Sequence, residues 1–382
     1  MKNEKRVMEA SEAIARGAAL CRPAVIPMYP ITPQTHIVEN LASMISDGLL
    51  DAEMIHAESE HSALSAAVGA SAAGARVFTA TASQGLALMH EVLFIASGMR
   101  LPIVMAVANR SLSAPINIWN DQQDSVSERD SGWIQLYAES GQEALDTTIM
   151  AFKIAESRNV RLPVMVCIDG FTLSHVFEPV EIPEQAKVDS FLPKYAPEDF
   201  LDVENPKSFG PIAFPNTFAG FRRMQQDAMR RAAAEIKRVN SEFKKEFGRG
   251  YGDGLIDTYM MEDAKYAVLA MGSVCGTVRH VVDEMRKEGK KYGMIRIKAL
   301  RPFPAREIVK AAENLKGICV IDRNLSPGLG GAVVNEVRAV LPDKKVSSAI
   351  AGLGGMDITP EMIKKAFKIA ESTDTRENWI LQ

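Results

Sequence analysis

The chain has 382 residues, of which 47% are hydrophobic and 24% charged, and its formal net charge is −4 at pH 7. This length exceeds what one hydrophobic core usually organises, so we expect two globular domains. The composition excludes long disordered tracts, and the lack of a Lys/Arg block interleaved with aromatic residues argues against a nucleic-acid partner.

Membrane insertion and export are not expected either. The most apolar stretch, residues 85–107, is interrupted by His90, Glu91 and Arg100, whereas a membrane-spanning helix needs about 20 nearly uninterrupted apolar residues. The first twenty residues carry several charges and no apolar signal core. A cytoplasmic location is therefore predicted.

From residue 6 to about residue 180, short apolar runs alternate with longer amphipathic or Ala-rich segments, as in βαβ units around a parallel sheet. The apolar runs predict strands at 24–28, 53–57, 77–80, 103–108 and 163–168. The segments between them predict helices at 7–20, 35–47, 62–73, 86–97 and 141–158. Nearly continuous apolar strands imply that both faces of the sheet are covered. The predicted fold class is α/β, with a doubly wound N-terminal domain.

The chain changes character after this region. Residues 181–216 are rich in proline and have no sustained period, which is typical of a linker, and residues 217–247 predict a long amphipathic helix. From residue 264 the alternation returns, with strands at 266–271, 293–297, 318–322 and 346–351 and helices at 277–288, 305–314 and 331–340. We therefore expect domains at 1–180 and 264–382, joined by residues 181–263.

The four cysteines are scattered and no CxxC pair exists, so this chain alone can build neither an iron–sulfur cluster nor a structural zinc site. Cys167 and Cys319 lie inside apolar runs and are expected to be buried strand residues.

Three predicted strands are followed by polar loops, and such loops are where open α/β sheets bind ligands. YPITPQT (29–35) is stiffened by two prolines and presents Thr32, a reasonable substrate contact, although a merely rigid loop explains it as well. HAESEH (56–61) places Glu58 and Glu60 at the start of a helix, where the macrodipole explains one glutamate better than two. TATASQG (79–85) collects small hydroxyl residues and a glycine that permits close approach of a ligand.

NRSLSAP (109–115) places Arg110 at the end of a further strand. The guanidinium group either pairs with polar residues that follow, Asn120, Asp121 and Asp124, or grips the carboxylate of a substrate through two hydrogen bonds.

Two glycine-rich segments are not assigned to ligands. GDG (252–254) has no Asn-Asn pair some 25 residues later and is interpreted as a turn. GLGG (328–331) lacks the third glycine of the dinucleotide fingerprint, so a nicotinamide site is not expected.

Together, YPITP (29–33), FTATASQG (78–85), NR (109–110), RDSGWIQLY (129–137) and DGF (169–171) resemble the alpha subunits of 2-oxoacid:ferredoxin oxidoreductases, in particular those acting on pyruvate. MGS (271–273), GT (276–277), RPFP (301–304) and DR (322–323) are similar to the transketolase-type C-terminal domain of that family. The resemblance covers most of the chain. It implies a domain that holds the pyrimidine ring of thiamine diphosphate.

The resemblance also implies roles for individual residues. Glu60, with Glu58 as the fallback, would hydrogen-bond the pyrimidine nitrogen and so activate the cofactor, and Thr32 and Arg110 would contact pyruvate. Other residues expected to line the cofactor pocket are Pro30, Ile31, Ser83, Gln84 and Gly85. The loop 120–124 departs from the family pattern, in which a His usually follows the Asp, so its role is left open.

By the same resemblance, the enzyme is an obligate complex. A beta chain would bind the diphosphate, Mg²⁺ and a [4Fe–4S] cluster, gamma and delta chains would complete the assembly, and coenzyme A and ferredoxin would be the other reactants. Three alternatives remain: a subunit for another 2-oxoacid such as a branched-chain one, a non-catalytic scaffold subunit, and a self-sufficient nucleotide-binding oxidoreductase.

Overall fold

The computed structural model of the chain describes residues 4–372 and 375–381. Its N-terminal half is built around a five-stranded sheet in the order β12-β6-β7-β5-β4. Strands β4 to β7 run parallel, and a parallel bridge from Val25 to Val77 adds the pair β2 and β3 beside β4. The strands are β2 (Val25–Met28), β3 (Glu53–His56), β4 (Phe78–Thr81), β5 (Val104–Asn109), β6 (Ile134–Tyr137), β7 (Val164–Asp169) and β12 (Ala299–Arg301). Every residue of β4 to β7 is buried, as in a sheet covered on both faces.

Helices cover both faces of this sheet. On β5, Val104 and Ala106 pack with α1, α2, α7 and α9, whereas Met105 and Val107 pack with α3, α4 and α5. The helices are α1 (Ala10–Leu20), α2 (Thr35–Ser46), α3 (Glu60–Ala72), α4 (Ser83–Leu88), α5 (His90–Gly98), α6 (Gln123–Ser127), α7 (Gly141–Glu156), α8 (Gln185–Phe191) and α9 (Pro215–Phe247). The doubly wound α/β architecture predicted from the sequence is confirmed.

The first element differs from the prediction. A helix was expected from residue 7, but β1 (Glu4–Glu9) pairs antiparallel with β8 (Phe177–Ile182), and α1 begins only at Ala10. The expectation was wrong for residues 7–9 because the pairing partner lies about 170 residues away along the chain, where local periodicity carries no signal.

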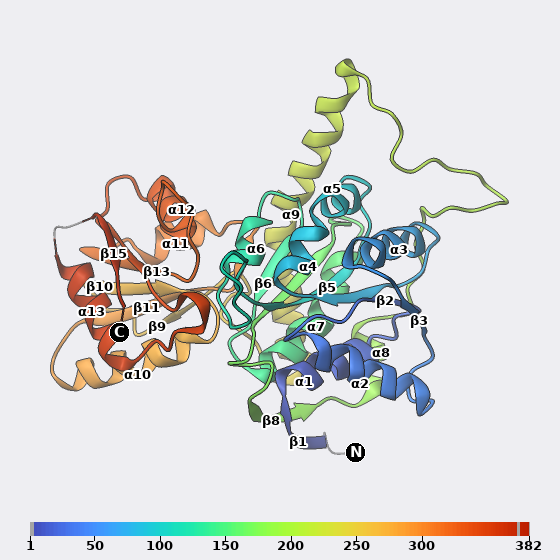
Figure 1. Cartoon of the computed structure of the whole chain (residues 1–382). Helices are drawn as coiled ribbons and strands as arrows, with labels where there is room; N and C mark the ends of the chain where they lie inside the picture. The colour runs from blue at the N-terminus through green and yellow to red at the C-terminus, as the bar shows by residue number, and fades with distance from the viewer. Residues whose placement is uncertain (1–3, 373–374, 382) are drawn as a thin grey trace.

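The long helix α9 has Pro215 in its first turn and ends at Gly248, whose φ of +75° is left-handed. Its C-terminal two thirds bury an apolar face against the N-terminal core. Its N-terminal part projects away from the body (Figure 1), and Phe218, Phe221 and Met224 remain exposed there.

The C-terminal half forms a second sheet in the order β15-β14-β13-β10-β11-β9, in which only β9 is antiparallel to its neighbour. Its strands are β9 (Ile256–Tyr259), β10 (Tyr266–Ala270), β11 (Tyr292–Ile297), β13 (Gly317–Asp322), β14 (Val346–Ile350) and β15 (Glu377–Trp379). The helices are α10 (Val274–Lys287), α11 (Ala305–Ala311), α12 (Ala332–Val340) and α13 (Pro360–Glu371). Cys167 and Cys319 are fully buried in β7 and β13, as expected.

The two units lie side by side and share structure (Figure 1). Strand β12 comes from the C-terminal half but pairs with β6 of the first sheet. One apolar cluster also runs from α3 and α5 to α11 and α12. Within the described residues, no helix has the length and apolar character needed to span a membrane.

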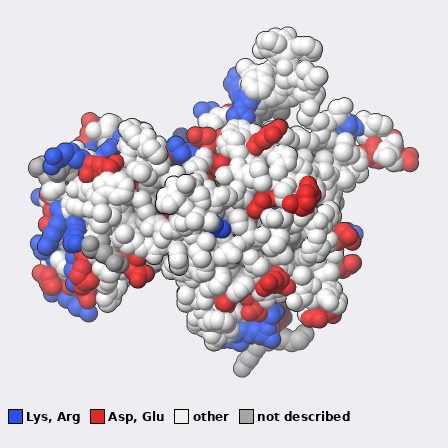
Figure 2. All heavy atoms as spheres, viewed as in Figure 1, with Lys and Arg blue, Asp and Glu red and all other residues white. Residues whose placement is uncertain are grey.

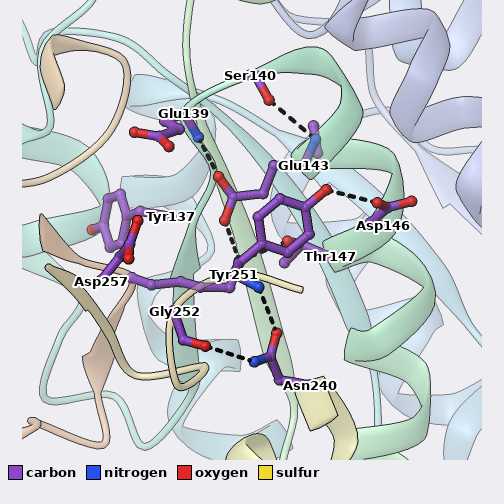
Figure 3. A network of polar contacts seen from close by, with 12 residues as sticks. Tyr137, Glu139, Ser140, Glu143, Asp146, Thr147, Asn240, Tyr251, Gly252 and Asp257 are labelled. Carbon is purple, nitrogen blue, oxygen red and sulfur yellow. Dashed lines mark hydrogen bonds and ion pairs between the residues drawn. The ribbon is translucent and has the colours of Figure 1, made fainter. Parts of the chain in front are cut away.

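A buried charged cluster also joins α7 to β11 and the residues that follow it. Glu143 accepts hydrogen bonds from Arg296 Nη2 and Lys298 Nζ, each at 2.6 Å, and Arg296 Nη1 lies 3.0 Å from Glu139 Oε1. Figure 3 shows Glu143 reaching back to the Glu139 amide while the neighbouring Tyr251 hydroxyl donates to Asp146. Burial opposes ionisation of Glu143, but the charges of Arg296 and Lys298 outweigh it and lower its pKa to about 2.

Candidate active site

Three loops converge at the carboxyl ends of β2, β4 and β5. These strands are neighbours, because β2 bridges to β4 and β4 pairs with β5. The loops are residues 29–34, the β4–α4 junction and the segment 110–124, which we call the Arg110 loop. Helix α3 begins beside them at Glu60, after Ser59 caps it by accepting the Ser62 amide.

Glu60 is buried against the first turn of α4. A Cβ atom added to Gly85 would lie 2.7 Å from Glu60 Oε1 and 2.5 Å from Thr81 Oγ1, so only glycine lets the two helices approach this closely. Within the part of the chain that the structure describes, no group donates a hydrogen bond to the Glu60 carboxylate, although the residue is only 7% exposed. The Thr81 hydroxyl is also buried without a partner. Among the described residues, the Glu60 carboxylate and a buried hydroxyl that has no hydrogen-bond partner thus face one spot, and proteins rarely leave such a buried hydroxyl unpaired.

Glu58 is placed differently. Its side chain is exposed and accepts a hydrogen bond from the Ser62 hydroxyl, which lowers its pKa. The structure therefore brings Glu60 to the strand ends and leaves Glu58 at the surface.

Arg110 is 8% exposed, and in the described part of the chain its guanidinium group makes no ion pair with Asp121 or Asp124. Its Nε donates to the Asn117 carbonyl at 3.1 Å and its Nη1 to the Thr32 carbonyl at 3.0 Å. Burial lowers its pKa, opposed by the charge of Asp124. Nη2 has no partner among the described residues. The guanidinium group is thus oriented by two carbonyl groups and keeps one nitrogen free for an anion.

The loop that carries Thr32 is anchored through Gln34. This buried side chain donates to the Ala80 carbonyl at 2.9 Å and accepts the Ile31 amide at 3.3 Å. Pro30 and Thr32 are exposed at the surface of the loop, and Ile31 is half-buried. The Thr32 carbonyl accepts a hydrogen bond from Arg110 Nη1, so the structure joins this loop directly to Arg110.

Asp124 is a residue whose role the sequence left open, and it organises the site. The carboxylate accepts the Ser83 and Arg110 amides at 2.9 and 3.0 Å and the Asn109 side chain at 2.7 Å. Burial raises its pKa to about 6, although these hydrogen bonds oppose the shift. Asp124 therefore ties the β4–α4 junction, with Ser83 at a φ of +50°, to the end of β5. Gln84 follows Ser83 and is half-buried.

The glycine-rich segment 328–331 is closed to a phosphate. Asp322 accepts the Val333 and Val334 amides at 2.9 and 3.1 Å, so a carboxylate already occupies the N-terminus of α12. A Cβ added to Gly331 would lie 2.1 Å from Asp322 Oδ2. GDG (252–254) lies in a turn, as predicted. In the described ranges, no cluster of three or more His, Cys, Asp or Glu side chains could hold a metal ion.

Two family models together match most of this chain. The family model "pyruvate flavodoxin/ferredoxin oxidoreductase, thiamine diphosphate-binding" matches residues 16–241, and "pyruvate:ferredoxin oxidoreductase core domain II" matches residues 264–363. The pyruvate synthase subunit PorA of Methanothermobacter thermautotrophicus is 52% identical over 375 residues, which are 98% of this chain and 97% of that protein.

Two further similar proteins are named for other 2-oxoacids. The ketoisovalerate oxidoreductase subunit VorA of Pyrococcus horikoshii is 46% identical over 365 residues, covering 94% of this chain and 92% of that one. The solved 2-oxoglutarate:ferredoxin oxidoreductase from Magnetococcus marinus has the same fold, with a TM-score of 0.74 at 20% identity. That match covers 96% of this chain but 65% of the solved chain.

Proposed function

Because this chain belongs to the pyruvate:ferredoxin oxidoreductase family, we propose that it is the alpha subunit of a pyruvate synthase. The complete enzyme converts pyruvate and coenzyme A to acetyl-CoA and CO₂, reversibly, and passes the electrons to ferredoxin.

The observation that carries this proposal is the position of the Glu60 carboxylate and the Thr81 hydroxyl beside Gly85, where no other described side chain or backbone group hydrogen-bonds either of them. Their place at the strand ends fits the pyrimidine ring of thiamine diphosphate, because the ring needs close approach and one carboxyl partner. When bound, the cofactor supplies the electron sink for loss of CO₂ from a 2-oxoacid. Glu60 would share a proton with the ring nitrogen. Pro30, Ile31, Ser83, Gln84 and Gly85 are proposed to line the same pocket.

Arg110 is proposed to bind the carboxylate of pyruvate. Its free Nη2 donates to one carboxylate oxygen, and the carbonyls of Thr32 and Asn117 hold the guanidinium plane fixed. Thr32 contributes its hydroxyl at the exposed side of the loop. Both groups bind and orient the substrate next to Glu60.

The rest of the active site is proposed to come from partner chains. Ile116 and Trp119 in the Arg110 loop are 80% and 53% exposed, and apolar surface of this kind marks a protein interface. Figure 2 shows that the visible surface between the two units carries few charged side chains, whereas the outer rim carries many. We propose that a beta chain covers this surface and brings Mg²⁺ and a [4Fe–4S] cluster, with gamma and delta chains completing a cytoplasmic complex.

A branched-chain 2-oxoacid is the second candidate substrate, because the VorA relative is 46% identical to this chain. One or two extra methylene groups change binding by only about 1–3 kcal/mol, and the partner chain shapes part of the pocket. The higher identity to a pyruvate synthase subunit, 52%, favours pyruvate.

The test is anaerobic purification of the complex through this chain, followed by coenzyme A-dependent dye reduction with pyruvate, 3-methyl-2-oxobutanoate and 2-oxoglutarate. The highest kcat/KM with pyruvate, together with co-purified iron–sulfur chains, supports the proposal. A higher kcat/KM with the branched-chain acid would move the enzyme to the second candidate. A chain that purifies alone and is inactive with all three acids would support the scaffold interpretation instead.

Replacing Arg110 with Lys should raise the KM for pyruvate by roughly 10- to 100-fold, because an ammonium group cannot hold two carbonyls and a carboxylate in one plane. The KM is measured by steady-state assay of the assembled complex. Arg100→Lys is the matched control, since the Arg100 guanidinium also donates to backbone carbonyls, those of Val160 and Arg161, but lies outside the site. An unchanged KM in Arg110→Lys would remove Arg110 from substrate binding.

A further inference from the structure

The Arg110 loop is held between the two units. Its residues 120–123 all bond to the C-terminal unit: the Asn120 carbonyl accepts the Gly355 amide at 2.7 Å, and the Gln122 amide donates to the Arg323 carbonyl at 2.7 Å. Further bonds join Asp121 Oδ2 to the Gly354 amide at 3.1 Å and Gln123 Oε1 to the Leu325 amide at 2.7 Å. The carboxyl ends of β13 and β14 therefore form a template for this loop.

A buried ion pair connects the carboxyl end of β13 to the first sheet. Asp169, at the end of β7, lies 3.0 Å from Arg323 Nη1 and accepts the Ser273 amide at 2.7 Å. Both charged residues are at most 5% exposed. Strand β7 pairs with β5, and β5 leads into the Arg110 loop. The Asp169–Arg323 ion pair therefore holds the start of this loop, through the first sheet, against the C-terminal unit that contacts residues 120–123.

Asn117 connects this template to the substrate-binding group. Its carbonyl accepts Arg110 Nε, while its side-chain Nδ2 donates to the Gly354 carbonyl at 3.1 Å and its Oδ1 accepts the Trp119 amide at 2.7 Å. The turn that faces Asn117 requires glycine, because Gly354 and Gly355 have φ of +62° and +81°. A Cβ at Gly354 would lie 2.6 Å from Asn117 Nδ2, and one at Gly355 would lie 2.3 Å from the Trp119 Cβ.

We infer that the C-terminal unit positions the substrate-binding arginine: the Gly354–Gly355 turn, acting through Asn117, sets the orientation of Arg110 toward the carboxylate of the 2-oxoacid. This inference rests on the proposed function and assigns to the second unit a part in substrate binding. Asn117 and Gly354 are positioning residues that never touch the substrate. Loss of either contact leaves the chemistry intact but allows the guanidinium group to swing away.

The test uses the assembled complex with Asn117→Ala and, from the other side of the contact, Gly354→Ala. Each variant should raise the KM for pyruvate roughly tenfold while kcat and the KM for coenzyme A stay within about twofold. Amide hydrogen exchange of residues 110–124 should become faster in both. Asn335→Ala is the matched control for Asn117, because Asn335 Nδ2 donates to the Gly331 carbonyl away from the loop.

A second control isolates the strain of the glycine replacement. Gly328 has a φ of +86° and open space around its Cβ position, so Gly328→Ala also places an alanine at a positive φ but without touching the Arg110 loop. Its KM for pyruvate should equal that of the parent enzyme. A rise equal to that of Gly354→Ala would overturn the inference.

A double-mutant cycle separates this inference from the proposed role of Arg110. If Asn117 acts through Arg110, Asn117→Ala should have no further effect on KM in an Arg110→Lys background. Additive effects, an unchanged KM in Asn117→Ala, or an equal rise in the KM for coenzyme A would each overturn the inference while leaving the role of Arg110 standing. An unchanged KM in Arg110→Lys would refute that role first, whatever Asn117 does.

Discussion

Replacing Glu60 with Gln is expected to lower the turnover of the assembled enzyme by roughly 10²- to 10⁴-fold, the usual contribution of a positioned proton-transfer group. The replacement keeps the size and shape of the side chain, so the packing against Gly85 and Thr81 is retained. An amide can form a hydrogen bond with the pyrimidine nitrogen but cannot share a proton with it. The loss should therefore appear in kcat.

The measurement is coenzyme A-dependent dye reduction under saturating pyruvate and thiamine diphosphate. Glu58→Gln provides the matched control, because Glu58 lies two residues away, is exposed and interacts with Ser62. It should retain turnover within about twofold of the parent enzyme. Full activity in Glu60→Gln would show that this glutamate does not serve the cofactor, and a loss in Glu58→Gln alone would transfer the role to that residue.

The largest effect on stability is expected from Glu143. Replacing it with Gln should lower the free energy of unfolding by about 3–5 kcal/mol, because removing one member of a buried charged cluster leaves the others uncompensated. The charge of Lys298 would be left least compensated, because this residue is fully buried and its other partners are the uncharged Thr147 hydroxyl and the ring of Tyr251. Urea unfolding followed by tryptophan fluorescence measures the change, with the buried Trp133 as reporter.

Two further variants identify the cause. Glu143→Leu combined with Lys298→Met should be more stable than Glu143→Leu alone, because the double change removes both members of one ion pair. Glu284→Gln breaks the solvent-accessible pair with Lys364 and should leave the free energy of unfolding almost unchanged. A Glu143→Gln chain as stable as the parent would show that the cluster does not stabilise the contact between the units.

The same cluster predicts a pH dependence. The pKa of Glu143 is about 2 in the folded chain against an ordinary 4.5, so the folded state favours the ionised carboxylate. Its contribution to stability is fully present above about pH 4.5 and is lost as the pH falls toward 2. The difference in urea midpoint between parent and Glu143→Gln should therefore narrow over this acidic range and remain constant between pH 6 and 7.

Strands β4, β5 and β7 could be located from the sequence because their apolar runs have few alternatives. Strand β6 is equally buried but was missed, because its four residues include the polar Gln135 and form no apolar run. Strand β5, predicted at 103–108, was displaced by a single residue, and α9 was extended by two residues at its start. Strands β1 and β12 could not be predicted, because each pairs with a segment far away in the chain. Sequence patterns describe local periodicity, whereas such pairings depend on tertiary structure.

The candidate site shows the same division. The sequence placed two glutamates at the start of α3, and only the tertiary approach of Gly85 separates buried Glu60 from exposed Glu58. Asp124 appeared as one polar residue among several, yet it receives donors from two strand ends. The contact of Asn117 with Gly354 joins positions 237 residues apart and leaves no local signal.

The projecting part of α9 has a consequence for the life of the chain in the cell. Phe214, Phe218, Phe221 and Met224 form an uncovered apolar stripe at its tip, with Phe214 68% exposed. Such a surface attracts other unassembled chains, and exposed apolar stripes are a recognised cause of aggregation. Copies made in excess of their partners would be the first to be captured by chaperones or degraded. We therefore expect cells to need this chain and its partner subunits in matched amounts.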